Sequence, residues 1–168
     1  MIYSYPDYYK KFKCIADKCP DTCCSDWQIV IDDESLEKYR NYAGEYRQTL
    51  HRNIQWEEGV FGHNRKGKCA FLRDDGLCDM YKHMGKDSLC TTCREYPRHT
   101  EEFENIKEIS LSLSCPEVAR ILMQKTDSVT FICEEDDEEE VFEDYDYFLF
   151  SNLEDIREKI LKIIQNRE

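Results

Sequence analysis

The placement of cysteine constrains this chain more than any other feature. Ten cysteines occur in 168 residues, and nine of them lie between Cys14 and Cys115. The stretch FKCIADKCPDTCCSDW, residues 12–27, holds four of them, including the adjacent pair Cys23-Cys24. Thiols at this density are typical of disulfides, a metal site or a nucleophilic centre. Any fold for this chain must therefore place the thiols where one of these roles is possible.

The start of the chain favours a metal site over disulfides. The segment MIYSYPDYYKKFKC lacks the apolar core of a secretory signal, and no apolar run is long enough to cross a membrane. We therefore expect a cytoplasmic protein, in which thiols stay reduced. An oxidised disulfide scaffold stays open as an alternative. A nucleophilic role has less support, because no single thiol is set apart for activation.

Charge narrows the choice of partners. Acidic residues outnumber Lys and Arg by 36 to 23, which gives a net charge of −13. A surface this negative repels nucleic acid and anionic lipid, so neither is an expected partner. A lysine-bearing protein suits it better.

The cysteine spacing is typical of ligands supplied by several loops. The order is Cys14-x4-Cys19-x3-Cys23-Cys24, Cys69-x8-Cys78, Cys90-x2-Cys93 and Cys115, with Cys133 apart. Thiolates from separate loops hold zinc tetrahedrally or bind iron–sulfur clusters. Nine thiols suffice for two four-ligand sites with one spare, or for one cluster with additional buried thiols. Only one pair has the zinc-knuckle form CxxC, so the pattern slightly favours iron–sulfur.

Four histidines accompany the cysteines. Three of them, His63, His83 and His99, lie within the Cys-rich region and would complete a zinc site, while His51 falls in an expected helix. Single histidines are more often surface or packing residues, which is the simpler interpretation for each.

Apolar periodicity predicts the regular elements. Spacings of three and four residues predict helices over 32–54 and 148–167, and a further helix starts at Pro116. Strands are predicted over 27–31 and 106–114, with a hairpin around the Asp-Asp-Gly turn of 69–81. The expected fold class is α+β. It is a small, irregular, metal-centred Cys-rich domain with short strands and a few helices, plus a C-terminal amphipathic helix.

The expected organisation has three parts. A Cys-rich metal- or cluster-binding domain spans residues 1–133, an acidic linker 134–147 and an amphipathic docking helix 148–168. The linker is predicted because residues 134–140 are seven consecutive acids. The last helix carries one apolar face, which either folds back over the domain or associates with another chain.

Four ordered motifs resemble a known family. They are YYKKFKCIADKCPDTCCSDWQIVID, CAFLRDDGLCDMY, SLCTTCREYPR and EISLSLSCPEVARIL. The sequence is similar there to the flagellin lysine-N-methylase family (FliB-like proteins), and to the wider YkgJ-like group of zinc- or iron-chelating proteins. The final segment, DYFLFSNLEDIREKILKIIQNRE, also resembles the methylases. The resemblance therefore covers nearly the whole chain.

The resemblance implies a ligand set, a reaction and a substrate. The implied metal or cluster ligands are Cys14, Cys19, Cys23, Cys24, Cys69, Cys78, Cys93 and Cys115, with Cys90 belonging to the methylase-like version. The implied cofactors are an iron–sulfur cluster, with zinc as the alternative, and S-adenosylmethionine as methyl donor. The implied substrate is a surface lysine of flagellin or of another lysine-bearing protein.

Methylase-family chains are longer than this one, so the chain is expected to be their N-terminal, Cys-rich part. No methyl-donor pocket is legible in it. Methyl transfer to lysine requires a deprotonated amine, hence a general base. Glu95 and Tyr96, beside Cys93, are the candidates, although packing or capping is the simpler role for both. The alternative function is a metal-stapled, non-catalytic module that docks partners through its last helix.

Overall fold

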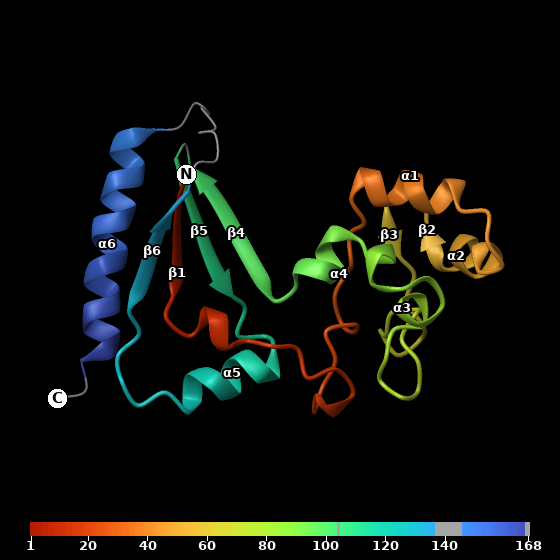
Figure 1. Ribbon diagram of the computed structural model, residues 1–168, viewed down its shortest axis with the longest axis horizontal. Helices are drawn as coiled ribbons and strands as arrows, with labels where there is room; N and C mark the ends of the chain where they lie inside the picture. The colour runs from red at the N-terminus through yellow and green to blue at the C-terminus, as the bar shows by residue number, and fades with distance from the viewer. Residues whose placement is uncertain (104, 137–145, 167–168) are drawn as a thin grey trace. The chain divides into compact units, whose positions relative to one another are not determined.

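The computed structural model describes residues 1–103, 105–136 and 146–166, and Figure 1 traces the chain. Its contacts divide the chain into two compact units. Unit 1 comprises Met1–Phe12, Arg98–Leu113 and Val118–Glu168, and unit 2 comprises Lys13–Pro97 and Ser114–Glu117. Both units are therefore assembled from segments that are distant in the sequence.

Unit 1 contains a four-stranded mixed sheet. Its order is β4-β5-β1-β6, made from β1 (Ile2–Pro6), β4 (Arg98–Phe103), β5 (Ile106–Leu111) and β6 (Phe131–Glu135). Strand β1 runs parallel to β5 and antiparallel to β6, whereas β4 and β5 are antiparallel. The register pairs Ile2 with both Ile106 and Glu135, so the first residues of the chain form an inner strand.

The predicted strand over 106–114 is confirmed as far as Leu111. That residue is buried and ends β5, whereas Leu113 is exposed. The predicted start of the next helix is also confirmed, because α5 spans Pro116–Met123. Proline is favoured there because the first turn of a helix leaves its N–H groups without partners in any case.

The predicted C-terminal helix is confirmed as α6, Tyr147–Gln165, which lies beside the sheet of unit 1 (Figure 1). The Asp146 carboxylate caps it by accepting the Leu149 N–H at 3.0 Å. The rings of Phe150 and Phe103 contact each other with centroids 4.7 Å apart. Arg157 of α6 and Glu108 of β5 form a two-pronged ion pair.

Unit 2 consists of short elements joined by long loops. Its helices are α1 (Asp33–Asn41), α2 (Arg47–Asn53), α3 (Asp79–Met84) and α4 (Thr91–Glu95), and its two paired strands are β2 (Ile54–Gln55) and β3 (Val60–Phe61). The loops are tied by four isolated bridges, Ser25–Lys68, Val30–Val60, His63–Cys69 and Leu72–Cys78. The buried core is Ile29, Ile31, Leu36, Tyr39, Tyr46, Leu50, Ile54, Phe61, Cys69, Phe71, Met80 and Cys90. Cysteine is thus part of the core itself.

The prediction of one continuous helix over residues 32–54 was wrong. The structure has α1 and α2 instead, with a break between Asn41 and Arg47. The side chain of Tyr42 folds over Gly44, where an added Cβ would clash with the phenol oxygen. Glycine is also a poor helix former, so the break falls at the weakest point of the pattern.

The strand predicted over 27–31 is reduced to a single bridge. Ile31 donates its N–H to the Gly59 carbonyl at 2.8 Å, and Phe61 donates to Ile29 at 3.1 Å. Ile29 and Ile31 are buried as the apolar pattern required. The pairing is short because the partner strand β3 has only two residues.

The hairpin predicted around the Asp-Asp-Gly turn is confirmed. Leu72 and Cys78 form its bridge, Arg73 donates to the Leu77 carbonyl at 3.0 Å, and Gly76 takes a φ of +78° at the turn. A positive φ of this kind favours glycine, which explains the turn sequence.

The fold is α+β, as predicted, and the irregular Cys-rich description fits unit 2. The expected domain boundaries after residues 133 and 147 both fall within unit 1. Glu134 and Glu135 of the expected linker belong to β6, and residues 137–145 lie outside the described residues. Nowhere in the described parts of the chain is there a helix long and apolar enough to cross a membrane.

Candidate metal centre

All nine cysteines between residues 14 and 115 fall in unit 2. Cys133, the tenth, lies on β6 of unit 1 and is exposed. Every cysteine is a free thiol in the structure. The nine candidate ligands therefore belong to one compact unit, and the cysteine that the spacing set apart does not.

Six of the nine come together from four separate segments. Cys23 and Cys24 lie in one loop, Cys69 on a bridge, Cys78 at the start of α3, and Cys90 and Cys93 at and within α4. The Cys69 N–H donates to the Cys24 carbonyl at 2.7 Å, which joins the first two segments. We call these six residues the inner thiols.

Four of the six inner thiols form two hydrogen-bonded pairs. Cys23 donates to Cys24, which raises the pKa of Cys23 and lowers that of Cys24. Cys93 donates to Cys90 in the same way, raising the pKa of Cys93 and lowering that of Cys90. Each pair therefore has one sulfur that holds its proton more tightly than a free thiol and one that loses it more readily to form the thiolate, which is the form that binds metals.

Electrostatic interactions connect the pairs to the other two inner thiols. Burial raises the pKa of Cys69 to about 11, with further contributions from Cys78 and Cys90. Burial also raises the pKa of Cys78, to which Cys23 contributes. The pKa of Cys93, raised first by its bond to Cys90, responds to Cys24 and Cys69 as well. All six sulfurs thus share one electrostatic neighbourhood.

The remaining three candidates are placed differently. Burial raises the pKa of Tyr96, with smaller contributions from Cys115, Cys23 and Cys19, so these thiols lie near its ring. Cys115 is buried and Cys19 partly buried, whereas Cys14 is exposed. Among the described residues, no contact joins Cys14 to the inner thiols.

The candidate side chains are not arranged around a common point. Across residues 1–103, 105–136 and 146–166, no group of three or more Cys, His, Asp or Glu side chains is positioned to hold an ion. The donor set nevertheless fits a soft metal, because zinc and iron–sulfur clusters are each held by four thiolates, and six neighbouring sulfurs are enough for one such site. Binding would require the thiols to lose protons and to turn from one another toward the ion.

The loop that carries the adjacent pair is fixed by its neighbours. The indole N–H of Trp27 donates to the Cys23 carbonyl at 2.7 Å, and the Cys24 N–H donates to the Thr22 hydroxyl at 3.1 Å. The Trp27 ring in turn lies 5.9 Å from that of Tyr96. These contacts hold the backbone of both cysteines while leaving their sulfurs available.

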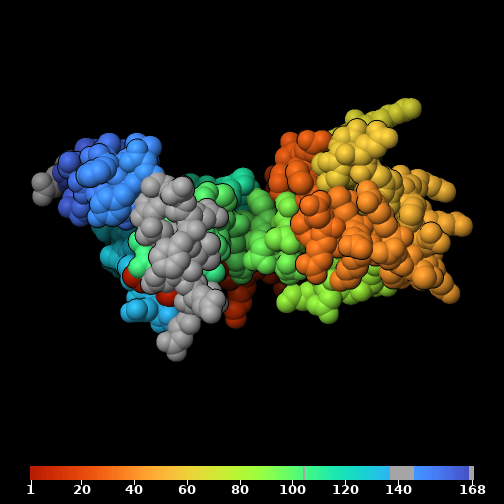
Figure 2. All heavy atoms as spheres, turned by 90° about the horizontal axis from the view of Figure 1, so that it is seen from above, coloured from red at the N-terminus to blue at the C-terminus, as the bar shows by residue number. Residues whose placement is uncertain are grey.

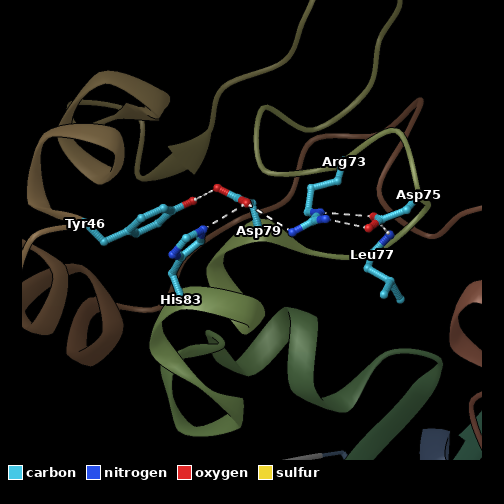
Figure 3. Close-up of polar contacts among 6 residues, drawn as sticks. All are labelled: Tyr46, Arg73, Asp75, Leu77, Asp79 and His83. Carbon is cyan, nitrogen blue, oxygen red and sulfur yellow. Dashed lines mark hydrogen bonds and ion pairs between the residues drawn. The ribbon is translucent and has the colours of Figure 1, made fainter.

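A polar network braces Cys78 through the residue that follows it (Figure 3). Tyr46 donates its hydroxyl to one Asp79 oxygen at 2.5 Å, and His83 lies 3.4 Å from the other. The His83 ring stacks on that of Tyr46 with centroids 4.9 Å apart. Arg73 pairs with Asp75 at 2.6 Å and approaches Asp79 to 3.8 Å. The network fixes the first turn of α3, so His83 has a structural role here.

Asp32 serves two helices at once. Its carboxylate accepts the Ser35 N–H of α1 at 2.9 Å and the Thr91 N–H of α4 at 2.8 Å. Cys90, the N-cap residue of α4, makes no capping hydrogen bond through its side chain. Asp32, which lies outside α4 in the sequence, accepts that hydrogen bond instead. Although partial burial opposes ionisation, the bonds from Thr91 and Ser35 lower the pKa of Asp32 to about 2.

Replacing Asp32 by alanine is expected to destabilise the fold by about 1–2 kcal/mol, because it removes an N-cap from α1 and one from α4. The folded pKa lies below its ordinary value of 3.8. The stabilisation is therefore present above about pH 4 and disappears as the pH falls through about 2. Urea unfolding of both proteins as a function of pH measures this difference. Glu37→Ala, an exposed change on α1, is the control, and a gap between wild type and Asp32→Ala that stays constant down to pH 2 would refute the capping role.

Sequence reasoning identified the cysteines but missed the residues that position them. Neither the double capping role of Asp32 nor the Tyr46–Asp79–His83 network was predicted. Glu95, a candidate base, ends α4 and pairs with Arg94 at 3.2 Å. Tyr96 follows it and shares a hydrogen bond of 3.0 Å with Ser114.

Comparison with known proteins agrees with this geometry. Residues 13–115 match the CxxCxxCC family, a zinc- or iron-chelating domain. That range includes all six inner thiols, together with Cys14, Cys19 and Cys115. Unit 2 itself covers Lys13–Pro97 and Ser114–Glu117, so the family range and the compact unit nearly coincide.

Curated relatives come from Salmonella. Over 133 residues, 74% of this chain, the sequence is 31% identical to the lysine-N-methylase of Salmonella typhimurium, of which the match covers 33%. The same identity and share of this chain relate it to the flagellar biosynthetic protein FliU of Salmonella muenchen, of which 78% is covered. The match thus spans about a third of the length of the lysine-N-methylases. No solved structure was found to match.

The family match over residues 13–115, the confinement of nine cysteines to unit 2 and the similarity to these relatives lead to one assignment. This chain belongs to the CxxCxxCC family of zinc- or iron-chelating domains, and its relatives include the lysine-N-methylases and FliU.

Proposed function

We propose that this chain is the metal-binding, Cys-rich part of a protein lysine N-methylase that acts on flagellin and uses S-adenosylmethionine. The observation that carries the proposal is the gathering of six thiols from four segments of unit 2. The printed names of the relatives supply the reaction class and the link to the flagellum. Because the chain spans a third of the methylases, other parts of such a protein would complete the enzyme.

The proposed group is an iron–sulfur cluster, with zinc as the alternative. The inner thiols would hold it, and Cys14, Cys19 and Cys115 would complete the set or serve a second site. When bound, such a group supplies soft metal–sulfur bonds that join four loops, and an iron–sulfur cluster also supplies redox chemistry. A cytoplasmic location follows from the need to keep these thiols reduced.

Methyl transfer makes one demand on the residues of an enzyme of this class. The lysine Nζ must lose a proton before its lone pair forms a bond to the methyl carbon, while the carbon–sulfur bond of the donor breaks and leaves a neutral thioether. Burial raises the pKa of Tyr96, so its phenol is protonated at neutral pH and suits donation. Glu95 is exposed and its carboxylate can accept a proton, so it is the better of the two candidate bases, provided that it leaves Arg94, with which it pairs.

The electrostatics favour a cationic substrate. The net charge is −13. In unit 1 a groove of about 570 Å³ is lined by acidic residues of the sheet and α6, namely Glu101, Glu108, Glu154, Asp155 and Glu158. Arg157 neutralises Glu108 within it, so the groove keeps a negative excess. Attraction of a lysine-rich protein by such a surface would weaken as salt is added.

Anaerobic purification followed by analysis for iron, zinc and sulfide tests the proposal. Iron with an equal amount of sulfide and visible absorption would support the cluster, whereas zinc in a colourless protein would support the alternative. Transfer of labelled methyl groups from S-adenosylmethionine to purified flagellin, by the longer protein but not by a Cys-to-Ser variant, would support the activity. A metal-free protein from anaerobic cells would refute the metal-binding role.

A second candidate function, an interaction module, is favoured by one observation on α6. Its apolar residues are exposed at 57, 55, 51, 48 and 74% for Leu149, Leu153, Ile156, Ile160 and Ile163. They alternate at spacings of four and three residues, the repeat of a coiled-coil seam. In Figure 2 no other described segment covers the outward side of α6, coloured blue.

The opposite face of α6 already has partners. Phe150, Arg157 and Gln165 contact Phe103, Glu108 and Val129 of unit 1. The apolar stripe is therefore left over after the helix has docked. We propose that it pairs with α6 of a second copy, since the regular repeat is self-complementary. Two such stripes would bury on the order of 1,000 Å², the lower limit for a specific interface.

The double change Leu153→Glu and Ile160→Glu is expected to convert this dimer to monomer. Burying an unpaired carboxylate costs several kcal/mol, so the dissociation constant should rise by about 100-fold or more. Sedimentation velocity over a range of concentrations measures the mass. Lys162→Glu, an exposed change off the stripe, should leave the dimer intact. A wild-type chain that stays monomeric at every concentration would refute the pairing.

A further inference from the structure

One histidine is fixed opposite an inner thiol. His63 and Cys69 form an antiparallel bridge. The flanking hydrogen bonds run from the Asn64 N–H to the Lys68 carbonyl and from the Ala70 N–H to the Gly62 carbonyl, both at 2.8 Å. This is the non-hydrogen-bonded type of antiparallel pair, in which the two Cα atoms lie about 4.5 Å apart and the side chains leave on the same face. The imidazole and the Cys69 thiol are therefore immediate neighbours.

The turn between them is held firmly. The Asn64 side-chain oxygen accepts N–H bonds from Lys66 at 2.8 Å and Lys68 at 3.2 Å. Gly67 takes a φ of +74°, which favours glycine. The segment GHNRKGK thus forms a tight connection that returns the chain from His63 to Cys69, so the pairing does not depend on a loose loop.

The imidazole lacks a partner for one of its nitrogens. His63 Nε2 is a buried polar atom without a hydrogen bond. The other histidines are engaged: His83 with Asp79, His99 with Glu101, and His51 through ring contact with Trp56. A buried nitrogen without a partner is costly and rare, and in native proteins it usually signals a function or a missing ligand.

The neighbour of this nitrogen is central to the thiol group. Cys69 is 5% exposed and interacts electrostatically with Cys78 and Cys90. Its backbone N–H donates a hydrogen bond to the Cys24 carbonyl. A metal held by Cys69 and its neighbours would lie on the side of the bridge that His63 faces. Imidazole nitrogen is an accepted ligand of both zinc and iron in mixed sulfur and nitrogen sites.

We propose that His63 supplies a nitrogen ligand, through Nε2, to the metal centre built on Cys69. The inference rests on the metal-binding role proposed above and adds a residue outside the cysteine set. It converts part of the centre from all-sulfur to mixed sulfur and nitrogen coordination. It also leaves one more of the nine thiols for a second site or for packing.

X-ray absorption of the full chain, purified with its own metal, tests the assignment directly. The spectrum at the edge of the bound metal should contain the outer-shell scattering of one imidazole ring in addition to sulfur. His63→Ala should lose that scattering and bind the metal at least tenfold more weakly. His63→Cys should restore binding with an added sulfur in place of the nitrogen, which a packing role does not predict. Changing His99, an exposed residue of unit 1, to alanine should alter neither measurement.

The outcomes separate the two proposals. A wild-type protein that holds metal with sulfur alone overturns the role of His63 but leaves the thiol centre standing. A wild-type protein without metal overturns both. If His63→Ala fails to fold, the His63→Cys spectrum decides, since an unchanged number of sulfur ligands in that variant would also overturn the assignment.

Discussion

Replacing Cys93 by serine is expected to remove the bound metal and to unfold unit 2. Cys93 is hydrogen-bonded to Cys90 and interacts electrostatically with Cys24 and Cys69, so it connects three of the four thiol segments. A serine hydroxyl stays protonated at neutral pH and is a poor ligand for soft metals. Thiolate metal sites contribute on the order of 10 kcal/mol to folding, which is comparable with the whole stability of a domain. Elemental analysis and thermal unfolding measure both consequences.

Cys133 offers a matched control for this change. It is also a cysteine, but it lies exposed on β6 of unit 1. Cys133→Ser should keep the full metal content and the wild-type unfolding temperature. If Cys93→Ser also kept its metal, Cys93 would have to be removed from the ligand set.

The parts of the fold that local signals encode could be predicted from the sequence. Pro116 marks the first turn of α5, the Asp-Asp-Gly turn forms its hairpin, and the apolar spacing of the last segment forms α6. Each of these depends on residues within one or two turns of each other. The grouping of the nine cysteines was accessible for a different reason, since their density alone leaves few other roles.

The sheet of unit 1 could not be predicted in this way. Strand β1 pairs with β5 and β6, more than a hundred residues along the chain, and nothing in the local pattern of residues 2–6 specifies those partners. Strand β6 was concealed because its last two residues are the first acids of the acidic run. Their charges are tolerated because every residue of β6 is exposed.

The same limit applies to the candidate site. The sequence separates Asp32 from Thr91 by almost sixty residues, so the cap that fixes α4 is visible only in the fold. His63 and Cys69 are close in sequence, but only the type of their pairing shows that the two side chains share a face. Spacing thus gives the candidate ligands, whereas long-range contacts determine which of them meet.

Removing the metal with a strong chelator under reducing conditions is expected to open unit 2 and to spare unit 1. The longest helix of unit 2 has nine residues and its paired strands have two each. Helices this short are marginal without tertiary support, and the core that supports them contains Cys69 and Cys90. Small units of this kind need a cross-link, such as a structural metal, in addition to their apolar contacts. Unit 1 has four paired strands and a capped helix of 19 residues, and it contains none of the proposed ligands.

Hydrogen exchange before and after chelation measures the two units separately. Amides of α1, α3 and α4 should lose protection once the metal is gone, while those of β1 and β5 should keep it. Returning the metal to the reduced protein should restore the original pattern, which distinguishes unfolding from damage. Protection that persists throughout unit 2 in a protein proven free of metal would mean that its apolar core suffices, and the thiols would then have to be explained by chemistry alone.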